Sequence, residues 1–141
     1  MYENVLVPTD GSAPAANAAE QAYEIADRFD ATLHSLFVIS VSENTPLGLP
    51  VEPAVEGLRN EGQRLTAEVT EGAPDGVETV TAIEQGDPDK RILEYAAEED
   101  VDVIVMGTHG RRGLDRFLIG SVTERVIRQA ECSVLVTQPD G

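Results

Sequence analysis

The residues with the clearest capacity for chemistry are the glycines and the serine between Gly107 and Ser121. Glycine has no Cβ, so a bound group can approach its backbone closely and positive φ is allowed. A short apolar run, typical of a buried parallel strand, ends at Met106, and a helix is predicted over about 122–129. We predict that Ser121 caps this helix and that Glu124 completes an S-x-x-E capping box. A helix start behind a glycine turn presents free N–H groups and a partial positive charge, which indicates an anion site.

The spacing of these residues resembles the nucleotide-binding motif of the universal stress protein family, G-x2-G-x9-G-[S/T]. The motif positions in this chain are Gly107, Gly110, Gly120 and Ser121. The pattern is neither a Walker A loop nor a G-x-G-x-x-G fingerprint, and the chain's only lysine, Lys90, lies elsewhere. The V-P-T-D-G-S segment at 7–12 and the G-D-P segment at 86–88 also look like family features. The resemblance therefore covers nearly the whole chain.

The resemblance implies that ATP lies across these loops, as it does in the nucleotide-binding members of the family. The residues that would contact it are Pro8, Thr9, Asp10, Val38, Met106, Gly107, His109, Gly110, Gly120, Ser121 and Val122. Pro8, Thr9 and Asp10 would line the adenosine end, with Val38 against adenine and Met106 and Gly107 near the ribose. His109 and Gly110 would approach the phosphates through backbone N–H groups. Gly120, Ser121 and Val122 would form a phosphate nest at the helix start.

Three of these residues have alternative roles that the sequence leaves open. Asp10 could accept hydrogen bonds from ribose hydroxyls or hold a metal that bridges the phosphates, and it could also form an Asx-turn with its own backbone. Val38 could be an ordinary core valine. Ser121 could be a simple N-cap, worth about 1 kcal/mol. Mg2+ or Mn2+ could accompany the triphosphate, because a strongly acidic protein gains when the charge of its ligand is neutralised.

Three functions follow from this resemblance. The first is an ATP-binding universal stress protein that acts as a nucleotide sensor or regulator in the stress response. The second is a slow ATP hydrolase, although phosphoryl transfer needs positioned cations and a placed water, and no lysine or evident base faces the predicted γ-phosphate. The third is a dimeric interaction module that binds no nucleotide. The presence of all four motif positions argues against it. No catalytic residue is assigned.

Strand and helix alternate along the chain, which predicts a mostly parallel sheet with helices on both faces. Strands are expected over 3–9, 32–39, 77–84, 101–106 and 133–137, and helices over 14–29, 54–71, 88–97 and 122–129. We predict one domain over 1–141, with an irregular loop over 40–53. The resemblance implies an open five-stranded sheet of order 3-2-1-4-5, a Rossmann-like, adenine nucleotide alpha hydrolase-like fold. Its topological switch point would bring the loops at 8–12 and 107–113 together, where open α/β sheets bind ligands.

The chain is strongly acidic, with 26 Asp and Glu against 10 Lys and Arg and a net charge of −16. Such a surface argues against nucleic acid and anionic membranes as partners. The near absence of lysine resembles proteins of halophilic organisms, in which salt screens self-repulsion. Between Gly107 and Arg128, however, the sequence contains five arginines and only two carboxylates. This local positive charge would suit a polyphosphate.

The remaining features favour a cytoplasmic protein that associates with itself. No apolar run reaches membrane-spanning length, no signal-like segment stands at the N-terminus, and the one cysteine, Cys132, reads as a small core residue. His34 reads as a packed or partly exposed strand residue, since no second metal-type ligand accompanies it. The last strand would lie at a sheet edge with an apolar sequence, Val134–Val136, which invites pairing. Family members dimerise through this strand, so the resemblance implies a homodimer.

Overall fold

The computed structural model describes residues 2–40, 51–108 and 120–138. Its five strands are β1 (Asn4–Pro8), β2 (Thr32–Ile39), β3 (Thr79–Gln85), β4 (Val103–Gly107) and β5 (Ser133–Thr137). They form one sheet of order β3-β2-β1-β4-β5, and every neighbouring pair is parallel. The predicted fold class and strand order are therefore confirmed. The bounds of the second and fifth strands match the prediction, and the other three differ by one or two residues.

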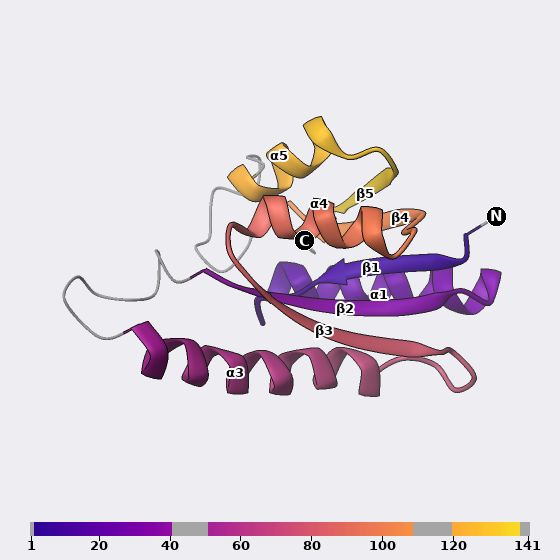
Figure 1. Ribbon diagram of the computed structural model, residues 1–141. Coiled ribbons are helices and arrows are strands. Elements are labelled where there is room, and N and C mark those ends of the chain that lie inside the picture. The colour runs from indigo at the N-terminus through magenta and orange to yellow at the C-terminus, as the bar shows by residue number, and fades with distance from the viewer. Residues whose placement is uncertain (1, 41–50, 109–119, 139–141) are drawn as a thin grey trace.

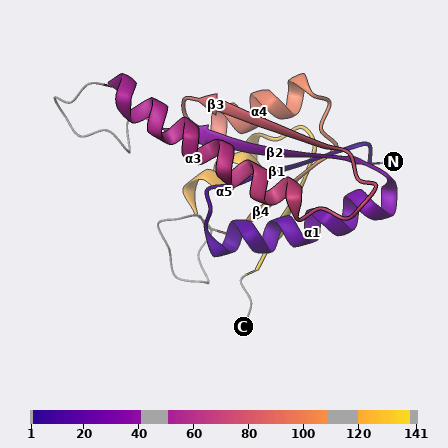
Figure 2. The ribbon, with the colours of Figure 1, turned by 90° about the horizontal axis from the view of Figure 1, so that it is seen from below.

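Among the described residues, four helices cover the sheet, namely α1 (Ala13–Phe29), α3 (Val51–Glu71), α4 (Pro88–Glu98) and α5 (Ser121–Gln129). Helices α1 and α3 lie on one face and α4 and α5 on the other (Figure 1), and the view from below shows the first pair in front of the sheet (Figure 2). Helix α3 begins three residues earlier than predicted, so 40–50 of the expected loop remain, and 41–50 lie outside the described residues. Within the described ranges, no helix has both the length and the apolar composition needed to cross a membrane.

The buried strands send alternate side chains to the two faces, as the period of a strand requires. Val5 and Val7 pack against the alanine stripe of α1, whereas Leu6 joins Ile104 and Met106 under α4 and α5. The buried members of the alanine stripe are Ala15, Ala18, Ala19, Ala22 and Ala26. Their small side chains let α1 lie close to the sheet.

The helical pattern from Ala15 to Phe29 predicts Phe29 as a core residue, and the pattern after Pro88 predicts Ala97 on the inner face of its helix. Both predictions are wrong. Phe29 is 46% exposed and packs edge-on against Tyr2 at the C-terminal end of α1. Ala97 is exposed, because the inner face of α4 follows Ile92, Tyr95 and Ala96. Cys132 precedes β5 and is half-buried, and it packs against the apolar cluster under α4 and α5.

His34 is buried within the sheet, as predicted for a packed residue. Its Nδ1 lies 2.7 Å from the Tyr95 hydroxyl and its Nε2 lies 3.0 Å from the Asn4 Oδ1. Since the amide oxygen of Asn4 can only accept a hydrogen bond, the neutral ring of His34 donates one through Nε2. Its Nδ1 then accepts a hydrogen bond from the Tyr95 hydroxyl. Burial lowers the pKa of His34, against an opposing effect of Glu99, and burial raises the pKa of Tyr95 to about 12.

Candidate functional site

The carboxyl ends of β1 and β4 mark the switch point of the sheet. Over the described strands, pairing between β1 and β4 is confined to Val5 with Val103 and Leu6 with Ile104. Beyond that, β1 continues to pair with β2 as far as Pro8, and β4 continues with β5 as far as Gly107. The chain leaves β1 toward α1 on one face and leaves β4 toward α5 on the other. The two predicted loops therefore start beside each other, at the place where open α/β sheets bind ligands.

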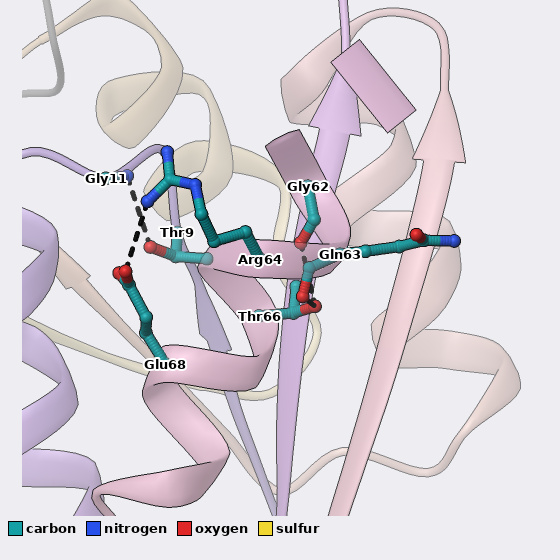
Figure 3. A network of polar contacts seen from close by, with 7 residues as sticks. All are labelled: Thr9, Gly11, Gly62, Gln63, Arg64, Thr66 and Glu68. Atoms are coloured by element: carbon teal, nitrogen blue, oxygen red, sulfur yellow. Dashed lines mark hydrogen bonds and ion pairs between the residues drawn. The ribbon is translucent and has the colours of Figure 1, made fainter. Parts of the chain in front are cut away.

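The turn after β1 is ordered by its own side chains. The Thr9 N–H donates to the Leu36 carbonyl at 2.8 Å, and the Thr9 Oγ1 accepts the Gly11 N–H at 3.3 Å (Figure 3). The Asp10 Oδ1 accepts the Ser12 N–H at 2.9 Å, so the Asx-turn alternative for Asp10 is confirmed. Ser12 in turn caps α1 by accepting the Ala15 N–H at 3.3 Å. Pro8, Thr9 and Asp10 are half-buried, and the backbone that would line a ligand is held in one conformation.

Gly107 ends β4 in contact with the first turn of α1. A Cβ at this position would lie 2.7 Å from the Pro14 Cβ and 2.9 Å from the Pro14 carbonyl oxygen. Cβ atoms essentially never make contacts this short, so a side chain here would displace α1 or β4. The motif glycine thus has a packing reason to be glycine, in addition to the close ligand approach that the sequence predicts.

The start of α5 differs from the prediction. Gly120 is the N-cap, with φ −65° and ψ 156°, and Ser121 is the first helical residue. The predicted capping box of Ser121 and Glu124 is therefore wrong. The physical reason is that the Gly120 N–H is bonded to the Thr108 carbonyl and its own carbonyl accepts the Glu124 N–H at 2.9 Å, which fixes the helix start one residue earlier.

This shift changes what the helix start can offer an anion. The Gly120 N–H already donates to Thr108, whereas the N–H groups of Ser121 and Val122 belong to the first turn and have no partner within the helix. The Ser121 side chain is exposed and Val122 is half-buried. Anion binding at this end would therefore fall to the backbone of Ser121 and Val122 and to the Ser121 hydroxyl.

Two threonines that the sequence analysis missed bond to the last residues of β4. The Thr123 hydroxyl donates to the Gly107 carbonyl at 3.0 Å, and the Thr137 hydroxyl donates to the Met106 carbonyl at 3.4 Å. Thr123 is buried at 4% exposure. The sequence carries a signal for it, because Thr123 and the buried Val126 are spaced by three residues and share one helix face.

The remaining predicted contacts are divided between the core and the part of the chain that is not described. Val38 and Met106 both belong to the apolar cluster under α4 and α5, so the core role of Val38 is observed. Met106 is buried and Val38 is half-buried. His109 and Gly110 lie outside the described residues.

The local positive charge is only partly described as well, since Arg111, Arg112 and Arg116 also lie outside the described residues. Arg125 approaches the buried carboxylate of Asp89 at 3.9 Å, and Arg128 pairs with Glu124 at 2.9 Å on the surface of α5. In the part of the chain that the structure describes, no group of three His, Cys, Asp or Glu residues could hold a metal ion.

Comparison with known proteins gives one consistent family over nearly the full length of the chain. A model described as the universal stress protein family matches residues 1–138. The universal stress protein MJ0531 of Methanocaldococcus jannaschii is 41% identical over 143 residues, covering 98% of this chain and 83% of that protein. The universal stress protein YxiE of Bacillus subtilis is 30% identical over 148 residues, covering 98% of this chain and 100% of that protein.

Solved structures agree with these relatives. The structure of the hypothetical protein MJ0577 superposes with a TM-score of 0.90 at 29% identity, covering 100% of this chain and 99% of that one. A universal stress protein in complex with cAMP superposes with a TM-score of 0.67 at 24% identity, covering 99% of this chain and 98% of that one. At this lower identity the likeness shows the shared fold.

Proposed function

This chain belongs to the universal stress protein family, and we propose that it binds ATP at the carboxyl ends of β1 and β4 and acts as a nucleotide sensor or regulator in the stress response. The observation that carries the proposal is the juxtaposition at the switch point. The ordered turn of Thr9 and Asp10 begins next to the end of β4, and the start of α5 is bonded to the residues that follow β4. These are the segments in which the nucleotide-binding motif is found.

The site divides the nucleotide between two kinds of contact. Pro8, Thr9 and Asp10 would hold the adenosine end, with Met106 and Gly107 at the ribose. The N–H groups of Ser121 and Val122 would receive phosphate oxygens, since the start of a helix favours negative charge. Mg2+ or Mn2+ would neutralise the triphosphate, and the Asp10 carboxylate is the group of the ordered turn that could join its coordination.

The proposal is tested by titrating purified protein with ATP in a high-salt buffer, with and without Mg2+, in a calorimeter. Gly110→Val should abolish the binding by filling the backbone approach to the phosphates. Gly57→Val is the matched control, because a Cβ at Gly57 on α3 has no atom within 4 Å. Absence of heat and of any thermal shift with ATP in the wild-type protein would refute the proposal and leave the interaction module. Titrations with AMP and cAMP identify the preferred adenine ligand.

Two further variants separate ligand contacts from folding. Asp10→Asn keeps an Oδ1 acceptor for the Ser12 N–H and removes the negative charge, so a loss of Mg-dependent affinity with unchanged stability would support a contact of the carboxylate with the metal or ribose. Ser121→Ala removes an exposed hydroxyl from a position where alanine is a good helix former. It should weaken ATP binding without lowering stability. Release of ADP in proportion to protein, lost in Asp10→Ala, would identify the slow hydrolase instead.

A further inference from the structure

Three hydrogen bonds join the carboxyl end of β4 and the following residue, Thr108, to later parts of the chain. The Thr123 hydroxyl reaches the Gly107 carbonyl at 3.0 Å across 16 residues of sequence. The Gly120 N–H reaches the Thr108 carbonyl, and the Thr137 hydroxyl on β5 reaches the Met106 carbonyl. The first two bonds join Gly107 and Thr108 to Thr123 and Gly120. They fix the position of the start of α5 relative to β4.

Of these three bonds, the Thr123 bond is the one made by a buried side chain. Thr123 is 4% exposed, and Gly107 is buried between it and the first turn of α1. Gly107 therefore has the Pro14 backbone on one side and the Thr123 hydroxyl bonded to its carbonyl. Because the N–H groups of Ser121 and Val122 are in the same helical turn as Thr123, a shift of Thr123 would move them as well.

We propose that Thr123 is a positioning residue for nucleotide binding: its hydroxyl, bonded to the Gly107 carbonyl, sets the distance between the ribose end of the site and the N–H groups that receive the phosphates. This inference rests on the proposed function. Thr123 itself touches no ligand and acts through Gly107 and the start of α5. Binding groups must be held within about half an ångström of their productive positions, so the loss of one such tether should weaken phosphate binding while leaving adenosine binding intact.

The experiment compares ATP with adenosine in matched variants. Thr123→Val keeps the side-chain size and removes the donor, whereas Thr123→Ser keeps the donor. Thr66→Val is the control, because Thr66 is a buried threonine, 1% exposed, whose hydroxyl donates to the Gly62 carbonyl at 2.8 Å within α3 (Figure 3). Dissociation constants are measured by calorimetry at a temperature at which circular dichroism shows every variant to be folded.

We expect Thr123→Val to weaken ATP binding about tenfold, the effect of losing one well-placed hydrogen bond to a buried carbonyl, and to leave adenosine affinity unchanged. Thr123→Ser should restore ATP affinity, and Thr66→Val should leave both affinities as in the wild type. The inference is overturned if Thr123→Val binds ATP as tightly as the wild type, if ATP and adenosine weaken equally, or if Thr66→Val loses as much ATP affinity. Should Thr123→Val fail to fold, Thr123→Ala, which also has no donor, replaces it with the same expected outcome.

Failure of the proposed function is distinguishable from failure of this inference. A wild-type protein that binds neither ATP nor adenosine would refute the proposed function. Hydrogen exchange at the Gly120 and Glu124 amides, which donate to the Thr108 and Gly120 carbonyls, then still reports on the tether. Faster exchange in Thr123→Val than in Thr123→Ser would support a role of the hydroxyl in holding this helix start, and equal exchange would overturn it.

Discussion

Replacing Gly107 by alanine should destabilise the protein through a contact that involves no ligand. A Cβ at Gly107 would lie 2.7 Å from the Pro14 Cβ, 2.9 Å from the Pro14 carbonyl oxygen and 3.0 Å from its carbonyl carbon. Two of these atoms are backbone and the third belongs to a proline ring, so none can rotate away. The start of α1 must therefore move. We expect the free energy of unfolding to fall by about 1–3 kcal/mol, the usual cost of overpacking a core.

The assay is urea unfolding in high-salt buffer, followed by circular dichroism, with the midpoint and the slope fitted separately. Gly57→Ala is the control, because its Cβ meets open space on α3 and alanine is the better helix former by about 1 kcal/mol. That variant should be as stable as the wild type or more so. A Gly107→Ala protein that unfolds at the wild-type urea concentration would refute the argument that α1 rests on this glycine.

Four further predictions address other parts of the molecule. Burial lowers the pKa of His34, so the unfolded chain binds a proton at higher pH than the folded protein and stability should fall as the pH drops below about 6.5. The melting temperature of His34→Gln should therefore change less between pH 7.5 and 5.5 than that of the wild type, and an equal change in both proteins would contradict this. The Ser35 hydroxyl is buried at 0% exposure with no hydrogen-bond partner among the described residues, so Ser35→Ala should raise the free energy of unfolding by about 1 kcal/mol in chemical denaturation, and a lower value would show that the hydroxyl has a partner. If the acidic surface is a halophilic adaptation, the melting temperature should fall when salt is reduced from about 1 M to 0.1 M, and an unchanged value would exclude it. A homodimer through β5 should give twice the 15.1 kDa chain mass in light scattering, and Leu135→Glu, at a 38% exposed position of this edge strand, should give a monomer.

Much of the fold could be predicted from the sequence because its signals are local and periodic. The alternation of apolar runs with helical stripes gives the class, and the apolar run at 32–39 has its bounds right to the residue. The alanine stripe of α1 identifies its buried face. The helical periodicity predicted Ala97 and Phe29 as core residues, and both are exposed. A periodic pattern does not show where along a helix its contact with the sheet ends. Those errors lie at the last turns of two helices.

The site was less predictable because its bonds connect residues far apart in the chain. Gly107 and Pro14 meet only because β4 lies beside β1 and α1 folds back over that pair. The S-x-x-E pattern at Ser121 matched a capping box, yet the bond between Gly120 and Thr108 moved the helix start by one residue. A local motif cannot register such a long-range bond, so the motif assigned the helix cap to Ser121 instead of Gly120.

This distinction bears on what the glycine motif says about function. Gly107 is required because it packs against Pro14. Gly120 bonds to Thr108 and to Glu124 at the start of α5 whether or not a nucleotide binds. An interaction module with this fold would need the same two residues, so their presence separates binder from non-binder less well than the spacing alone suggests. Ser121 is different, because its exposed side chain is not at the capping position. The case for a nucleotide site therefore depends most on Ser121, where folding does not require the serine hydroxyl, and the Ser121→Ala titration examines that position directly.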